Sequence, residues 1–418
     1  MSRTSSRRWL FGIASAPYGC FNGLVAVALP YVLRRHGIPL DRIAEIGALV
    51  QLPAIWYFLW APVVDIGLRR RTWVIVLSVL SAVFAAIAIG HNMAPAILPL
   101  TILLVTASVL NQPISSAIGG LIVTVTPNAT RGRTAGWSQA GILGGGVLAG
   151  GLTVWLTGHA STAVTGLSAG LMIALPSVAV LAIKEPASPK TRLRQHLAEM
   201  IRDVTKTLKR RDVWLGLVFF LSPVGAGALM FLFSAVAADF HASTTMVIWV
   251  VVLAGLLTPV GALIGGFMCD RFDRWRVYAI AGLAAAVSAG AMLLAPMTPT
   301  TYLVGSAAYA LSTGFCYTAF MSLALDLVGT NTAATGTRFT LFMAAVNVPV
   351  VYMLLLDGLG QERFGVRGMI GVDALANGLF GVILLLSLGW LRSKFGVRPE
   401  LGTVTPVVDG QLSPQQVG

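Results

Sequence analysis

Long apolar stretches alternate with short polar ones along the whole chain. A helix needs about 20 apolar residues to cross the roughly 30 Å of hydrocarbon in a bilayer. Twelve stretches of suitable length, numbered here as segments 1 to 12, lie at about 9–33, 43–64, 72–91, 96–125, 134–157, 161–183, 213–238, 244–268, 276–296, 299–326, 338–358 and 367–391. The pattern predicts an all-α integral membrane protein with twelve transmembrane helices.

The overall composition agrees with this interpretation. Of the 418 residues, 56% are hydrophobic and 11% are charged, whereas soluble proteins devote about a quarter of their residues to Asp, Glu, Lys and Arg. A water-soluble globule is therefore excluded. The three cysteines lie in or beside apolar segments without CxxC spacing, so we predict buried thiols, with neither a disulfide framework nor a metal site.

The basic residues fall almost entirely on one side of the predicted membrane. If the N-terminus and the even-numbered loops share a side, 24 of the 29 Lys and Arg residues lie there. Cytoplasmic loops carry such an excess of positive charge, so we expect an inner-membrane protein with both termini in the cytoplasm. The net charge of +13 then reflects topology and attraction to anionic lipid, and no nucleic-acid partner is expected.

The chain divides into two similar halves. A polar stretch rich in Lys and Arg separates six segments from six, which predicts an N-terminal bundle at 1–183, a cytoplasmic linker at 184–212, a C-terminal bundle at 213–391 and a cytoplasmic tail at 392–418. Asp65 and Asp270 are 205 positions apart, and so are Arg133 and Arg338. These matches indicate a duplicated six-helix unit.

The loops after segments 2 and 8 each place an Asp just before arginines. This resembles the signature of the major facilitator superfamily, whose members consist of two pseudo-symmetric six-helix bundles that alternate access to a central site. By this resemblance we expect a monomeric transporter with a gate on the cytoplasmic side. The residues assigned to that gate are Asp65, Arg69, Arg133, Asp270, Arg271, Arg274 and Arg338.

A narrower resemblance concerns the cargo. The stretch from Tyr57 to Trp73, and that from Thr318 to Leu341, are similar to AmpG-like permeases, a family whose members carry muropeptides, acetyl-CoA or, in shorter relatives, siderophores. Muropeptide permeases have an acidic residue after the glutamine of segment 4, where this chain has Gln112-Pro113. We therefore expect an amphipathic organic cargo, with a siderophore-type compound first and a cell-wall fragment second.

Polar residues in segments 4 and 10 repeat at helical spacing. Such a stripe marks one face of a helix, and in the facilitator fold helices 1, 4, 7 and 10 line the pathway. The alternative is that small polar residues hold neighbouring helices together. The predicted substrate-binding residues are Tyr18, Asn22, Asn111, Gln112, Ser115, Phe219, Tyr309, Ser312 and Tyr317.

Other functions have less support. The chain lacks a P-loop and an HExxH motif, so we predict no enzyme activity, no cofactor and no metal. A glycine run from Gly141 to Gly151 loosely resembles a motif of drug exporters, although close helix packing also explains it. A drug-type exporter and a non-transporting membrane sensor on the same fold both remain alternatives.

Proton coupling in such transporters usually needs an acidic residue inside the pathway. By sequence, Asp357 lies at the outer end of segment 11 and Asp373 in segment 12, on a helix that usually stands outside the pathway. We therefore expect no coupling carboxylate at mid-depth. If protons are a partner, the coupling candidates are Glu45 and Asp326.

Overall fold

The structure is a computed structural model of the whole chain. It describes residues 8–36, 38, 46–47, 49–60, 63–64, 67–91, 96–185, 202, 205–206, 209–233, 236–328 and 335–395. The predicted residues Glu45 and Asp65 lie outside the described residues, as do most of the linker and tail. Arg338 belongs to a described helix, but its side chain is outside this set.

The N-terminal bundle is built from the first half of the chain. Segment 1 forms one continuous rod, α1 (Trp9–Gly23), η2 (Leu24–Ala28) and α2 (Leu29–Arg35). The remaining elements are α4 (Pro53–Trp56), η3 (Tyr57–Leu59), α5 (Arg70–Gly90), α6 (Ile97–Val125), η5 (Asn128–Thr130), α7 (Arg131–His159), α8 (Thr162–Ala174) and η6 (Leu175–Ala182).

The C-terminal bundle repeats the helical pattern with two irregularities. Its elements are α10 (Arg211–Phe220), α11 (Leu229–Leu232), η7 (Ala237–Phe240), α12 (Thr244–Arg271), α13 (Arg274–Leu294), α14 (Pro299–Val328) and α15 (Thr335–Phe395). The last is two helices joined at Gly365, whose φ of 66° and ψ of −163° are not helical. Segments 11 and 12 therefore form an antiparallel hairpin with a very tight turn.

Segment 7 is not the single helix predicted at 213–238. It breaks between α10 and α11, where Gly225 and Gly227 have positive φ, a conformation that glycine adopts without strain. Side chains satisfy the released backbone carbonyls, because the Tyr278 hydroxyl donates to Val224 O at 2.8 Å and the Tyr352 hydroxyl donates to Leu221 O at 2.9 Å. A broken helix is tolerated at membrane depth when protein groups take over its hydrogen bonds in this way.

Nine helices among the described residues are long and apolar enough to cross a membrane. The predicted number was twelve. Segment 2 lies partly outside the described residues, segment 7 is broken into short pieces, and segments 11 and 12 are assigned as one helix, which accounts for the difference. The prediction of an all-α membrane architecture in two helical bundles is confirmed, and the described residues are compatible with twelve helices.

The glycine run of α7 is a packing surface. A Cβ on Gly150 would come within 2.8 Å of Gly23 O, and one on Gly145 within 3.1 Å of Ala16 O. Only small residues allow two helix backbones to approach this closely. The run therefore joins α7 to α1, in agreement with the packing interpretation.

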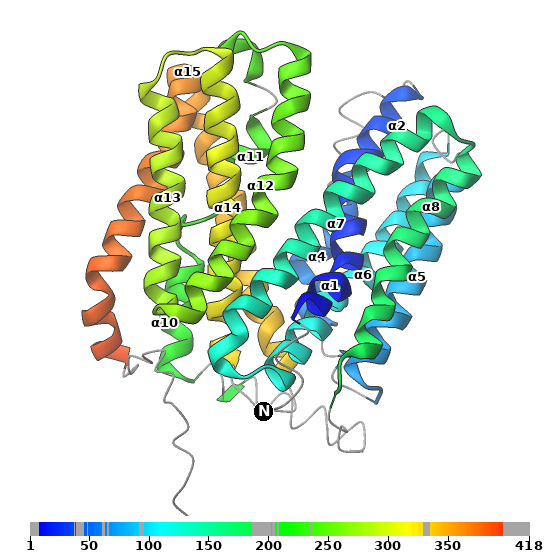
Figure 1. Cartoon of the computed structure of the whole chain (residues 1–418), viewed down its shortest axis with the longest axis horizontal. Coiled ribbons are helices and arrows are strands. Elements are labelled where there is room, and N and C mark those ends of the chain that lie inside the picture. Colours follow the sequence, from blue (N-terminus) through cyan, green and yellow to red (C-terminus); the bar gives the residue numbers. More distant parts are fainter. Residues whose placement is uncertain are drawn as a thin grey trace, which may run out of the picture.

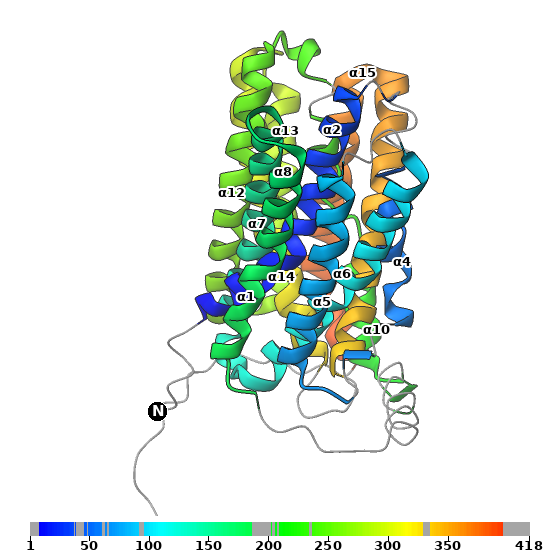
Figure 2. The same ribbon diagram turned by 90° about the vertical axis from the view of Figure 1, so that its right-hand side faces the viewer.

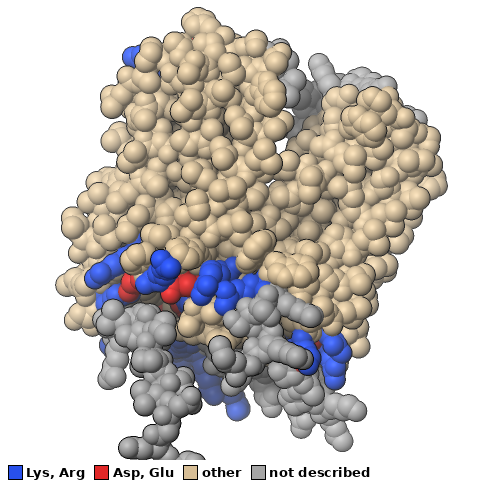
Figure 3. Space-filling view, viewed as in Figure 1, with Lys and Arg blue, Asp and Glu red and all other residues tan. Residues whose placement is uncertain are grey.

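The two bundles meet at one end and diverge at the other. Figure 1 shows the bundles side by side, and Figure 2 shows their helices running nearly parallel. Lys and Arg gather at the end where the bundles meet, whereas the opposite end carries a hollow between two tan lobes (Figure 3). We call these the basic end and the open end.

Candidate functional site

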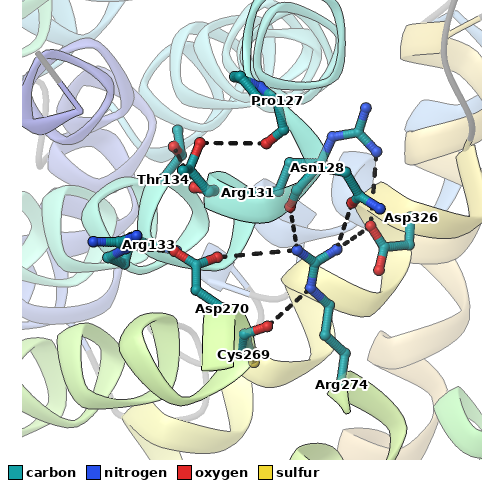
Figure 4. A network of polar contacts seen from close by, with 10 residues as sticks. Pro127, Asn128, Arg131, Arg133, Thr134, Cys269, Asp270, Arg274 and Asp326 are labelled. Atoms are coloured by element: carbon teal, nitrogen blue, oxygen red, sulfur yellow. Dashed lines mark hydrogen bonds and ion pairs between the residues drawn. The ribbon is translucent and has the colours of Figure 1, made fainter. Parts of the chain in front are cut away.

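Ion pairs connect the two bundles at the basic end (Figure 4). Arg133, in the first turn of α7, donates from Nε to Asp270 Oδ2 at 2.6 Å, and its backbone N–H donates to the same oxygen at 3.2 Å. Asp270 ends α12 in the other bundle, and its side chain is only 3% exposed. A buried carboxylate is tolerated when charged donors surround it.

Arg274 extends this network between Asp270 and Asp326. Its guanidinium lies 3.9 Å from Asp270 Oδ1, forms a close ion pair with Asp326, and donates to the side-chain oxygen of Asn128 at 2.9 Å. Arg131 lies 3.7 Å from Asp326. We call this set the interbundle ion cluster; it consists of Asn128, Arg131 and Arg133 from the N-terminal bundle and Asp270, Arg274 and Asp326 from the C-terminal bundle.

Glycines bring the backbones of α7 and α12 together beside the cluster. A Cβ on Gly132 would come within 2.7 Å of Asp270 Oδ1, Cys269 Cβ and Gly266 O, and one on Gly136 within 2.8 Å of Ala262 O. The contact between the bundles therefore depends on the absence of side chains at these positions.

A small cavity of about 70 Å³ lies between the bundles on the open side of this cluster. Its walls combine polar uncharged groups with apolar ones, contributed by Ser15, Tyr18, Ile114, Ser115, Ile118, Ser138, Gln139, Ile142, Met321, Phe339 and Met343. Gln139 follows Arg131 by eight residues, so the cavity is about 12 Å along α7 from the start of the helix.

Hydrogen bonds order the wall formed by α1 and α6. The Tyr18 hydroxyl donates to Gln112 Oε1 at 3.3 Å, and Asn111 Nδ2 donates to Tyr18 O at 3.4 Å. Ser15 and Ser138 form a 2.7 Å hydrogen bond across α1 and α7. Of the residues predicted on segment 4, Ser115 lines the cavity, whereas Asn111 and Gln112 bond to Tyr18 of α1 and do not line it. Ser116, the next residue of α6, forms a close hydrogen bond with Thr340 of the other bundle.

Comparison with known proteins identifies the family. Residues 11–346 match the Major Facilitator Superfamily. The chain belongs to this superfamily. It is 30% identical over 365 residues to the anhydromuropeptide permease of Escherichia coli K12, an alignment that covers 81% of this chain and 71% of the permease.

Solved structures of superfamily members share the fold. The proton:xylose symporter XylE bound to 6-bromo-6-deoxy-D-glucose gives a TM-score of 0.66 at 14% identity, covering 96% of this chain and 98% of the symporter. A structure of the E. coli fucose:proton symporter FucP gives 0.68 at 14% identity, covering 92% and 99%. At such identities the likeness establishes the facilitator fold alone.

The predicted binding residues of the C-terminal bundle lie outside the cavity of this facilitator. Phe219 packs edge-on against Trp275 with ring centroids 5.0 Å apart, deep in the aromatic core. Ser312 bonds to Ser288 of α13 at 3.1 Å, and the Tyr317 hydroxyl lies near Gly227 at the helix break. In the other bundle Asn22 is half-buried on α1, one turn beyond Tyr18. Their role in binding stays a prediction.

Sequence reasoning missed part of the cavity. Ser138 and Gln139 lie on segment 5, where only the glycines attracted attention, and Met321 and Phe339 lie near the basic ends of α14 and α15. A glutamine inside an apolar segment costs free energy unless it has a polar partner or faces a wet cavity. The position of Gln139 in segment 5 could therefore have indicated the cavity.

The remaining gate candidates differ in their surroundings. Arg271 is exposed and lies over the Phe267 ring at 4.0 Å, and Arg69 is exposed just before α5. A contact that the sequence did not suggest holds the start of that helix: Glu185 accepts hydrogen bonds from the backbone N–H groups of Arg70 and Arg71 at 3.1 and 3.2 Å. Carboxylates stabilise helix N-termini in this way.

One expectation about acidic residues needs correction. Asp357 is not at the outer end of its helix, because the helix continues to the turn at Gly365, and both Asp357 and Asp373 are completely buried. The segment boundary at 358 was wrong because the following residues are polar and suggested a loop. Asp326, a predicted coupling residue, lies between two arginines of the interbundle ion cluster, and its role in coupling stays a prediction.

Proposed function

We propose that this facilitator imports an amphipathic organic solute across the inner membrane by alternating access, with both termini in the cytoplasm. The observation that carries the proposal is the cavity between the bundles, which lies between the cluster at the basic end and the hollow at the open end. In an alternating-access cycle, such a site is exposed to one side of the membrane at a time.

The interbundle ion cluster serves as the inner gate in this proposal. Its ionised groups lie at or near the ends of helices, so a rocking motion of one bundle separates Arg133 from Asp270 as rigid ends move apart. The ion pairs favour the arrangement with the basic end closed. Opening of the basic end breaks these ion pairs, so the free energy of solute binding must offset the loss of the pairs during the transport cycle.

The lining of the cavity favours an uncharged or weakly charged cargo. Anionic groups are usually bound by Arg or Lys, and the lining residues are serines, a tyrosine, a glutamine and apolar side chains. A volume of about 70 Å³ is small beside the roughly 300–1,000 Å³ of drug-sized sites. Binding of a larger cargo therefore requires separation of the bundles from the open side.

Two cargo classes compete. The sequence departure at Gln112-Pro113 favours a siderophore-type compound, whereas the similarity to an anhydromuropeptide permease favours a cell-wall fragment. Uptake of labelled pyochelin and of a labelled anhydromuropeptide into proteoliposomes compares them directly.

We expect one of these labels to accumulate above the level in empty vesicles. Gln139→Ala should reduce uptake of that label, while Leu148→Ala, on the lipid-facing side of the same helix, should not. Equal loss in both variants would contradict a binding role for the cavity. Absence of exchange and binding for both labels would contradict the cargo proposal.

A further inference from the structure

The C-terminal bundle contains two acidic side chains completely enclosed by protein. Asp357 and Asp373 are both 0% exposed. They lie eight residues before and eight residues after Gly365, so each is about 12 Å along its helix from the turn. The two helices that carry them meet closely beyond the pair, where a Cβ on Gly360 would lie 2.8 Å from Gly368 O. The hairpin thus holds both carboxyl groups at one depth.

The two carboxyl groups have very different hydrogen bonding. The Tyr309 hydroxyl of α14 lies 3.1 and 3.0 Å from the two carboxylate oxygens of Asp373 and donates to them. Neither carboxylate oxygen of Asp357 has a hydrogen-bond partner among the described residues. Asp357, Asp373 and Tyr309 all lie in the C-terminal bundle, and we treat them as one unit.

No cation offsets this unit within the described part of the chain, where neither carboxylate forms an ion pair with Lys, Arg or His. The titratable group that faces it from α14, besides its own member Tyr309, is Cys316. Tyr278 of α13 and Tyr352 of α15 bond to the backbone of the helix break instead. An ionised carboxylate without a cation is costly in such a place, and binding of a proton removes its charge.

A hydrogen-bonded connection leads from Asp373 to the break in segment 7. One turn after Asp373, Asn377 donates from Nδ2 to the Asp373 backbone oxygen at 3.0 Å. Its Oδ1 accepts from the backbone N–H of Gly225 at 2.9 Å. Gly225 has a φ of 73° and belongs to the break in segment 7. Asp373, which can bind a proton, and Asn377, which holds the backbone of the break, therefore lie one turn apart on the same helix.

We propose that Asp357, Asp373 and Tyr309 form a proton-binding site, and that its occupancy is coupled through Asn377 to the conformation of the break between α10 and α11. The inference rests on the proposed transport function and adds a proton as co-substrate. An unpartnered, fully enclosed carboxyl group is the observation that points to this ligand. When a proton binds, a carboxylate of the pair becomes a neutral carboxyl; when it leaves, two negative charges repel across the hairpin.

Infrared difference spectroscopy tests the site without knowledge of the cargo. The purified protein in lipid nanodiscs is shifted between acidic and alkaline buffer, and the carbonyl band of a buried protonated carboxyl is followed. We expect this band to disappear at alkaline pH. It should be abolished or shifted in Asp357→Asn or Asp373→Asn, and its frequency should change in Tyr309→Phe. Glu362→Gln, which changes an exposed acid on the same element, should leave it unchanged.

Several outcomes would overturn the proposal. A spectrum unchanged in both aspartate variants would place the titrating group elsewhere. A response to Na⁺ at constant pH, with no response to pH, would assign the site to that cation. If an aspartate variant does not fold, Tyr309→Phe and Asn377→Ser keep both carboxyl groups and the charge of the site, and each should still shift the band.

A transport assay separates this proposal from the proposed function. Exchange of labelled cargo without a gradient requires only binding and alternation, whereas accumulation driven by a pH gradient also requires proton coupling. We expect Asp373→Asn to retain exchange and to lose at least tenfold of gradient-driven accumulation. Gradient dependence that survives in both aspartate variants would contradict the proton site. Failure of the wild-type chain to exchange either label would contradict the cargo proposal and leave the infrared result standing.

Discussion

Two groups of acidic residues in this facilitator have opposite surroundings. In the interbundle ion cluster, Asp270 and Asp326 each contact arginine side chains, and the contacts cross from one bundle to the other. In the buried acid pair, Asp357 and Asp373 lie within a single bundle. The Tyr309 hydroxyl donates to Asp373, and neither acid forms an ion pair among the described residues. The first group has compensated charge, and the second does not.

This difference indicates two ways in which a carboxylate can respond to transport. An acid held by arginines keeps its charge, so it responds only when the partners move apart. An acid without a cation can respond by binding a proton while its neighbours stay in place. The cluster is therefore suited to sense the distance between bundles, and the acid pair is suited to sense protons. The predictions below test that division.

The largest effect is expected from Gly132→Val at the α7–α12 contact. A Cβ there meets three atoms at 2.7 Å, and overpacking of this kind costs about 1–3 kcal/mol, enough to reduce the closed form at the basic end about fivefold or more. Spin labels on cysteines introduced at His159 and Leu294, exposed near the open ends of α7 and α13, would measure the change, since the three native cysteines are buried.

Gly151→Val is the matched control for this substitution. It lies on the same helix, and a Cβ there meets nothing within 4 Å, so it introduces the same side chain without the steric clash. We expect the distance between the labels to shorten in Gly132→Val alone. Equal distributions in the two variants would show that the glycine contact does not control opening.

A somewhat smaller effect is expected from Asp270→Asn. It removes the charged acceptor of two Arg133 hydrogen bonds, and hydrogen bonds to charged groups are worth about 1.5–3 kcal/mol each where buried, reduced here because Arg133 is 42% exposed. The same label pair should report a shift toward the form open at the basic end. Arg271→Ala should not shift it, because Arg271 lies over Phe267 and outside the cluster.

The exchange of the two residues sharpens that test. Arg133→Asp combined with Asp270→Arg preserves an ion pair across the bundles and should recover part of the closed form. If the double variant opens at the basic end as much as Arg133→Asp and Asp270→Arg do together, the ion pair does not hold the basic end closed, and the two charges serve only membrane topology.

Tyr309→Phe should have a modest effect that depends on pH. The hydroxyl donates to the Asp373 carboxylate, and loss of a hydrogen bond costs about 1 kcal/mol. A donor stabilises the ionised carboxylate more than the neutral acid, so the loss in melting temperature should be larger in alkaline than in acidic buffer. The label distance should not change at fixed pH. A loss independent of pH would indicate a purely structural tyrosine.

The smallest effect is expected from Glu185→Gln. Glu185 accepts hydrogen bonds at the N-terminus of α5 within one bundle, and charge at a helix terminus is worth about 0.3–1 kcal/mol. The melting temperature should fall slightly and the label distance should stay constant. A shift in that distance would mean that acids within a bundle also control opening, which would remove the distinction drawn above.

Much of the fold could be predicted from the sequence, because each helix must satisfy its own backbone hydrogen bonds in hydrocarbon. Apolar length therefore located the helices, although it also predicted segment 7 as continuous despite Pro223, Gly225 and Gly227. The cluster residues Arg133, Asp270 and Arg274 were also predicted. Charges are costly inside the hydrocarbon, so those at the ends of neighbouring helices gather at the same membrane surface. Asp326 was predicted only as a coupling candidate, and not as part of the cluster.

The sequence by itself determined the helices, the duplication and the side on which the positive charge gathers, because each follows from hydropathy or spacing along one dimension. Only the tertiary structure decided which polar side chains meet. Asp357 and Asp373 lie at one depth because Gly365 folds one helix back on the next, and Tyr309 bonds to Asp373 and does not line the cavity. Burial and pairing depend on contacts between residues distant in the chain, and hydrophobic periodicity does not specify those contacts.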